Sequence, residues 1–199
     1  MKIYYSALMK NVREYVTSLF NEYRGGDLFY HSLDHTKTVV KRTFEIAANY
    51  SFTEAELFIL SSAAWFHDTG QLTGGQELHE DRSVSIMQDF LKAKGVEKNI
   101  IDEIENCICA TKIPHKPKSL LDEILCDADT YNLGTEDFLK NDKLLKKEME
   151  LRNIPVDNWD EKTLELLQSH QYFTPYCRAL LNIGKENNTA LIRQRLKIK

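Results

Sequence analysis

The sequence has no long apolar run, no low-complexity segment and no internal repeat. No stretch approaches the ~20 consecutive apolar residues that a helix needs to span a bilayer. The first residues carry the charge of Lys2 but lack the continuous apolar segment of a signal peptide. These absences argue against a membrane protein or a secreted one, and we expect a cytoplasmic protein.

Cysteine and excess positive charge are also scarce. The four cysteines fit reduced thiols in a cytoplasmic protein; they are Cys107, Cys109, Cys126 and Cys177. The first two lie two residues apart in a helical pattern, where side chains do not face each other, so buried thiols are favoured over a metal pair. The net charge of −4 excludes a broad basic face for polymeric nucleic acid, but a small anionic ligand is compatible with it.

Alternating strand-type patterns are missing, and helical periodicity is present throughout, so we predict an all-α fold. The 199 residues suffice for one domain, residues 1–199, with a helical core over about 28–134 and a C-terminal helical layer over about 135–199. Apolar spacing and breaker residues predict helices over about 4–23, 33–49, 53–66, 77–94, 97–111, 136–152, 160–170 and 175–195. A further helix between the fifth and sixth of these carries Leu121 and reaches Gly134.

The third of these helices has the clearest start signal. Thr53 and Glu56 match a capping box, and Phe52 and Leu57 are spaced as its hydrophobic staple. The segment from Leu57 to Phe66 is apolar on every side apart from two serines, which predicts a helix buried on every side. The next two residues, a histidine and an aspartate, should therefore sit at the end of the most central helix, before a loop at Gly70–Gly75.

Histidines and acids in three segments are the candidates for chemistry. His31 and His35 are four residues apart and share a face if the helix is continuous, and His67-Asp68 ends the buried helix. Imidazole and carboxylate groups are the ligands of catalytic divalent metals. The alternatives are that each histidine is structural or at the surface, and that Asp68 merely stops the helix.

The third segment places two acids, Asp127 and Asp129, in an otherwise apolar helix. One of them could face solvent while the other pairs with an arginine or a lysine. A shared metal would instead explain four residues at once, namely His35, His67, Asp68 and Asp129.

These three segments together resemble the HD superfamily of metal-dependent phosphohydrolases, and in particular its small bacterial subgroup of metal-dependent HD phosphohydrolases. The resemblance extends over nearly the whole chain. The matching segments are Tyr30-His31 with His35, Ala64–Gly70, His79–Ser83, Asp127–Asp129 with Leu133-Gly134, the region of Thr111, and Tyr172–Thr174.

The resemblance implies an all-α fold around five core helices and the metal ligands His35, His67, Asp68 and Asp129, with Asp127 as the fallback for the last. Some relatives bind a second metal through further histidines, for which His79 and His115 are the candidates here, with His31 as a substrate contact or a supporting residue. Gln71 stands where many relatives have an apolar residue, which predicts a polar pocket mouth.

The mechanism expected from this ligand set is hydrolysis by metal-activated water, with Asp68 and His67 as catalytic residues. A divalent ion lowers the pKa of a bound water from ~15.7 toward ~7 and polarises a phosphoryl oxygen. Mixed nitrogen and oxygen ligands suit Mn, Fe, Co, Ni or Zn better than Mg or Ca. Candidates for binding the phosphate lie on the loop before the Asp129 helix and nearby, although this loop could equally be solvated; they are Lys112, His115, Lys116, Lys118 and Arg82.

We therefore expect a phosphohydrolase that acts on a small phosphoester such as a nucleotide or a cyclic nucleotide. One alternative is a di-iron oxygenase of the same fold, which would need both His79 and His115 as ligands. Another is a module that senses a nucleotide without chemistry. Neither a membrane nor polymeric nucleic acid is an expected partner, and the sequence leaves a homodimer open.

Overall fold

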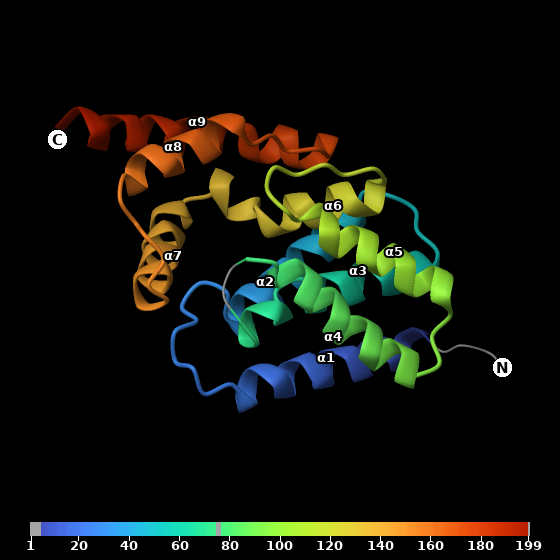
Figure 1. Ribbon diagram of the computed structural model, residues 1–199. Coiled ribbons are helices and arrows are strands. Elements are labelled where there is room, and N and C mark those ends of the chain that lie inside the picture. Colours follow the sequence, from blue (N-terminus) through green and yellow to red (C-terminus); the bar gives the residue numbers. More distant parts are fainter. Residues whose placement is uncertain (1–4, 75–76, 199) are drawn as a thin grey trace.

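The computed structural model describes residues 5–74 and 77–198, and within them the chain is helical without a strand (Figure 1). The predicted all-α fold is confirmed. The elements are α1 Tyr5–Glu22, α2 Leu33–Ala47, α3 Glu54–Phe66, the 3-10 helix η1 Thr69–Leu72, α4 His79–Ala93, α5 Lys98–Ala110, α6 Leu120–Asp129, the 3-10 helix η2 Tyr131–Gly134, α7 Phe138–Leu151, α8 Trp159–Ser169 and α9 Pro175–Ile198.

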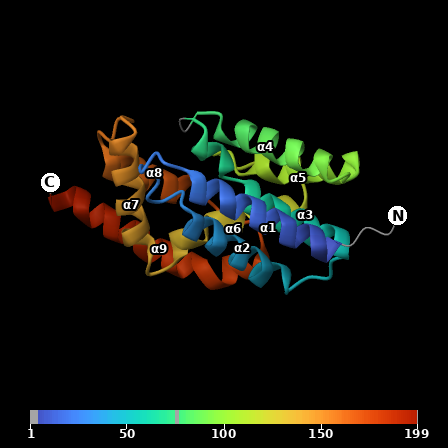
Figure 2. The same ribbon diagram turned by 90° about the horizontal axis from the view of Figure 1, so that it is seen from below.

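Helix α3 is the centre of the core, as its apolar sequence predicts. It packs against α1, α2, α5 and α6, and every residue from Phe58 to Phe66 is buried. The view in Figure 2 shows α1 and α2 running alongside it. Its start is the predicted capping box, because Thr53 Oγ1 accepts the N–H of Glu56 while the Glu56 carboxylate accepts the N–H of Thr53. The end of α3 is therefore fixed deep inside the protein.

The C-terminal helices form a layer on one side of this core, opposite α1 (Figure 1). A second, smaller hydrophobic cluster joins them, consisting of Leu133, Phe138, Leu167 and Ile192. Helix α9 packs closely on η2, where a Cβ added at Gly184 would lie 2.0 Å from the carbonyl oxygen of Gly134. Only glycine at position 184 allows this approach. The boundary between core and layer within one domain remains a prediction.

Three local expectations differ from the structure. Helix α4 begins at His79, two residues later than predicted, after Leu78 takes a left-handed conformation with φ of 58°. The apolar periodicity of the second helix predicts that Phe44 lies on its inward face, but Phe44 is 37% exposed. The segment expected to be a loop after Asp68 starts with the buried 3-10 helix η1, and the end of that predicted loop at Gly75 lies outside the described residues.

Across residues 5–74 and 77–198, no helix combines the length and the apolar character that a membrane span requires.

Candidate metal centre

Three helix ends bring the predicted ligand residues together. His35 lies in the first turn of α2, whose N-cap is Ser32. His67 and Asp68 follow the last residue of α3, and Asp129 is the last residue of α6. One nitrogen or oxygen atom from each of the four side chains lies within 4.8 Å of the others. The three segments therefore converge on one point, as a shared cation would require.

The ligand atoms of this four-residue cluster lie close together, and Nε2 of His35 and Oδ1 of Asp129 form a hydrogen bond. Nε2 of His67 lies 3.0 Å from Oδ2 of Asp68 and 3.5 Å from Oδ1 of Asp129. Nε2 of His35 lies 3.3 Å and 3.2 Å from the same two oxygens. Nevertheless, His67 Nε2 and Asp68 Oδ2 are buried and make no aligned hydrogen bond. Buried polar atoms without partners are rare, and ligand atoms that share one cation leave this signature, so the residues present fit a metal ion.

The tautomer of His67 is set by the backbone of its own helix. Its Nδ1 lies 2.9 Å from the carbonyl oxygen of Ala64. A carbonyl oxygen can only accept a hydrogen bond, so Nδ1 carries the hydrogen and Nε2 points into the cluster. This is the usual way in which proteins orient a metal-binding histidine.

Opposite charges compensate for burial in the cluster. Burial alone would lower the pKa of His67, but the carboxylates of Asp68 and Asp129 hold it well above its ordinary value. Burial would likewise raise the pKa of Asp68, yet His67, His31 and His35 hold it well below the ordinary range, and Asp129 is also lowered. Both acids are therefore carboxylates at neutral pH, which favours a bound cation.

Two more histidines border the cluster without belonging to it. His79 Nε2 lies 3.4 Å from Oδ1 of Asp68, the oxygen that faces away from His35 and His67. Its Nδ1 lies 3.5 Å from a carboxylate oxygen of Glu80. The ring of His31 lies 6.3 Å from that of His79, centroid to centroid. The roles predicted for both, a second metal or a phosphate contact, remain predictions.

A cavity of about 550 Å³ opens beside the cluster. Its core side includes His31, Asp68, His79, Thr111, Lys112 and Asp129. Its other side is formed by the C-terminal layer, through α7 and α8; this wall includes Asn141, Asp142, Leu145, Trp159, Lys162 and Leu166. The sequence predicts no role for these helices, and the structure makes them one wall of the candidate site.

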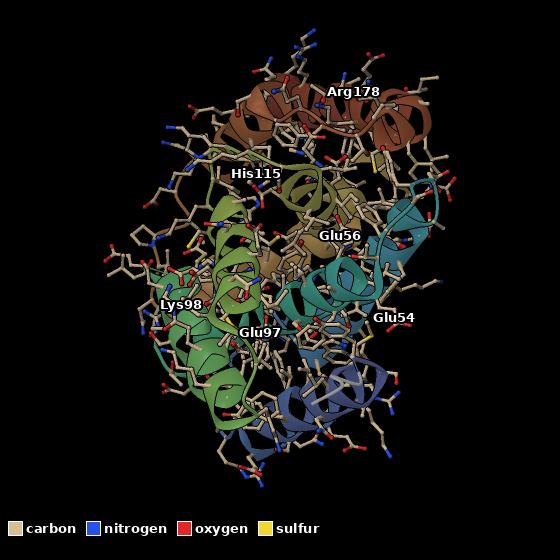
Figure 3. The ribbon with its side chains drawn as sticks, turned by 90° about the vertical axis from the view of Figure 1, so that its right-hand side faces the viewer. Glu54, Glu56, Glu97, Lys98, His115 and Arg178 are labelled. Atoms are coloured by element: carbon tan, nitrogen blue, oxygen red, sulfur yellow. The ribbon has the colours of Figure 1, made fainter. Side chains whose placement is uncertain are left out.

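The loop between α5 and α6 contributes less to the cavity than its charges predict. Lys112 lines the cavity and pairs with Asp81, with its Nζ 2.9 Å from a carboxylate oxygen. Figure 3 shows His115 on the side toward α9, where its ring lies 6.1 Å from that of His170, centroid to centroid. Lys116 is exposed and, among the described residues, does not belong to the cavity lining. The phosphate roles of His115 and Lys116 gain no support from these positions and remain predictions. His115 does not belong to the four-residue cluster, and the di-iron alternative remains a hypothesis.

The polar pocket mouth predicted from Gln71 is wrong. The side chain of Gln71 is fully buried, and its Oε1 accepts a hydrogen bond of 2.6 Å from Arg152. Arg82 is half-buried and donates hydrogen bonds to the carbonyl oxygens of Gly70 and Glu77. A phosphate role for Arg82 remains a prediction without structural support.

The two acids of the third segment have different positions. The carboxylate of Asp127 accepts the N–H groups of Phe173 and Thr174 and the hydroxyl of Thr174, each within 2.8 Å. It thereby fixes the start of α9, while Asp129 is the acid in the cluster. The geometry supports Asp129, and not the fallback Asp127, as the candidate ligand.

Sequence reasoning missed the buried pair Glu148 and Arg152 on α7 and just after it. Arg152 donates hydrogen bonds to Asp27, Gln71 and Gly74. Glu148 contacts the segment that carries His31. The only local signal was charge in an amphipathic helix, which solvated helices share.

Comparisons with known proteins agree with this geometry. The model of the HD domain family matches residues 32–133, a segment that contains all four side chains of the cluster. Among solved structures, the fold is similar to that of YpgQ from Bacillus subtilis, which was crystallised in complex with ADP. That match has a TM-score of 0.63 at 18% sequence identity and covers 98% of this chain and 96% of YpgQ. None of the curated proteins compared with the chain matches it. The sequence, the four-residue cluster and the family match together show that this chain belongs to the HD domain family.

Proposed function

We propose that this protein is a metal-dependent phosphohydrolase that cleaves a nucleotide or a cyclic nucleotide with metal-activated water. One observation carries the proposal. Four ligand atoms from His35, His67, Asp68 and Asp129 lie within 4.8 Å of one another, and two of these residues bring buried polar atoms that have no hydrogen-bond partner.

The proposed ligands are the four residues of the cluster, and their mixed nitrogen and oxygen atoms suit Mn, Fe, Co, Ni or Zn. When bound, a divalent cation would polarise a phosphoryl oxygen and lower the pKa of a water toward ~7. The two oxygens of Asp68 face different ways, Oδ2 toward the cluster and Oδ1 toward His79 beside the cavity. Asp68 can therefore accept a hydrogen bond from the attacking water and orient it toward the phosphorus.

The shape of the cavity supports a nucleotide as the substrate. Its volume of about 550 Å³ falls within the usual range for small-molecule sites. Its lining includes carboxylates and histidines of the core, and it also includes the apolar side chains of Trp159 and Leu166 from the C-terminal layer. The indole Nε1 of Trp159 donates a 2.8 Å hydrogen bond to Asp142, which fixes the ring as a flat surface. The ADP bound to YpgQ, a protein of similar fold, is a ligand of the same class.

The test is hydrolysis by the purified protein with Mn²⁺, using mononucleotides, ADP, cyclic nucleotides and an aryl phosphate as substrates. We expect phosphate release by the wild type and its loss in His67→Ala, which should keep its helical circular-dichroism spectrum. Asp127→Asn is the matched control, because Asp127 lies outside the cluster, and it should retain turnover. Equal activity in the wild type and His67→Ala would contradict the proposal. Tight ADP binding without turnover under any metal would favour the nucleotide-sensing alternative.

A further inference from the structure

Glu148 is a fully buried acid on α7, outside the residues that the family model matches. Its Oε2 accepts hydrogen bonds from three successive backbone N–H groups, those of Phe29, Tyr30 and His31, at 2.8–3.0 Å. These three residues precede α2, the helix that carries His35. A single carboxylate of the C-terminal layer therefore fixes the backbone that enters the candidate metal centre.

The second oxygen of the same carboxylate holds the side chain of His31. Oε1 of Glu148 lies 2.5 Å from Nδ1 of His31. Burial alone would raise the pKa of Glu148, but the hydrogen bond and the charge of His31 hold it below its ordinary value. Glu148 is thus a carboxylate, which only accepts hydrogen bonds, so Nδ1 of His31 carries a hydrogen.

This arrangement turns the other nitrogen of His31 away from Glu148. In an imidazole ring Nε2 lies at the edge remote from Nδ1, and His31 lines the cavity. Its side chain is 12% exposed. Nε2 therefore faces the space beside Asp68 and His79, where a ligand of the metal centre would place its phosphate.

We propose that Glu148 is a positioning residue that directs Nε2 of His31 at the phosphate of the bound nucleotide. In the complex, the ring of His31 lies between two anions, the Glu148 carboxylate and the phosphate, and can form a hydrogen bond with each. The inference rests on the proposed nucleotide ligand of this site. It extends the site to a residue of α7, 117 positions away from the histidine that it orients.

The variant Glu148→Gln separates orientation from packing. Glutamine has nearly the same shape, and its carbonyl oxygen can keep accepting the three backbone N–H groups. Its amide nitrogen is a donor and would bond to Nδ1 of His31, which moves the ring hydrogen to Nε2. Nitrogen NMR of histidine-labelled protein, with His31 assigned by loss of its signals in His31→Ala, reports both ring nitrogens. We expect a protonated Nδ1 in the wild type and an unprotonated Nδ1 in Glu148→Gln. The same state in both proteins, or an unprotonated Nδ1 in the wild type, would overturn the inference.

ADP affinity measured by calorimetry with Mn²⁺ tests whether Glu148 acts through His31. We expect Glu148→Gln to weaken ADP binding roughly ten-fold, which is about the contribution of one hydrogen bond. In the His31→Ala background, Glu148→Gln should weaken ADP binding less than about two-fold, because the ring through which Glu148 acts is then absent. Equal losses in both backgrounds would show that Glu148 is merely structural, and a wild type that binds no ADP would remove the phosphate contact.

The matched control is Asp127→Asn, which alters another buried carboxylate that accepts two backbone N–H groups. It should leave the nitrogen signals of His31 and the ADP affinity unchanged. If Glu148→Gln does not fold, the wild-type spectrum and the ADP affinity of His31→Ala decide the matter, and an unchanged affinity overturns the inference.

The hydrolase proposal fails separately from this one. A wild type that binds ADP with the expected coupling but releases no phosphate would contradict the hydrolase proposal and support the role of Glu148. Turnover that is lost in His67→Ala, together with ADP binding that is insensitive to Glu148→Gln, would support the hydrolase proposal and contradict the role of Glu148.

Discussion

Two aspartates on α6, two positions apart, should respond in opposite ways to the same substitution. Asp129 belongs to the four-residue cluster, whereas Asp127 holds the start of α9 through the backbone of Phe173 and Thr174. Changing either residue to asparagine removes one negative charge and keeps the size of the side chain. The pair therefore compares a metal ligand with a structural carboxylate in the same helix.

The expected magnitudes follow from linkage. A cation present at a hundred times its dissociation constant stabilises the folded protein by about 2.7 kcal/mol. For a chain of this length, that corresponds to a rise in Tm of about 5–11 °C. Asp127→Asn leaves buried hydrogen bonds weakened, at a cost of about 1–3 kcal/mol, so its Tm without metal should fall by about 2–12 °C.

The assay is thermal unfolding of each protein in EDTA and in Mn²⁺. The wild type should gain the full increment in Tm on adding Mn²⁺. Asp127→Asn should melt earlier in both conditions but keep that increment, and Asp129→Asn should lose most of it. An undiminished increment in Asp129→Asn, or its loss in Asp127→Asn, would refute the assignment of the two acids.

Three further predictions follow from the same structure. Replacing Arg152 by methionine leaves Gln71 without its buried partner. Urea unfolding should then show that the free energy of unfolding falls by about 3–5 kcal/mol, and a fall below about 1 kcal/mol would contradict this prediction. Mn²⁺ affinity measured by calorimetry should rise with pH above the ordinary value of 6.5, because the raised pKa of His67 keeps its ring protonated there and the cation must displace that proton; an affinity independent of pH would argue against His67 as a ligand. Trp159→Ala should weaken ADP binding by about 1–3 kcal/mol if the base stacks on the indole, and unchanged binding would place the base elsewhere.

The parts of the fold and site that could be predicted from the sequence depend on local patterns. The capping box at Thr53 and the apolar run that follows it indicate a buried helix within a few residues, and this places His67 and Asp68 in the interior. The last acid of α6 could be chosen over its neighbour only through the resemblance to the HD superfamily. The periodicity of this helix alone did not decide which of the two acids is the candidate ligand.

The remaining features depend on contacts between distant residues. In the sequence, Glu148 is indistinguishable from a solvent-exposed acid on an amphipathic helix. Nothing near it in the chain indicates that its carboxylate contacts His31. A polar pocket mouth was expected because Gln71 stands where many relatives in the HD superfamily have an apolar residue. Gln71 is instead buried and accepts hydrogen bonds from Arg152. The position of Arg152 depends on how α7 packs against the core. Long-range pairs of this kind leave no periodic signal in a single sequence.

The central claim is that four side chains from three helix ends bind one divalent cation. A crystal structure of the protein with Mn²⁺, with data collected at the manganese absorption edge, tests it most directly. The account predicts an anomalous peak at about 2.0–2.2 Å from the ligand atoms of His35, His67, Asp68 and Asp129. A manganese ion bound elsewhere, or no ion between these four residues at saturating Mn²⁺, would contradict it.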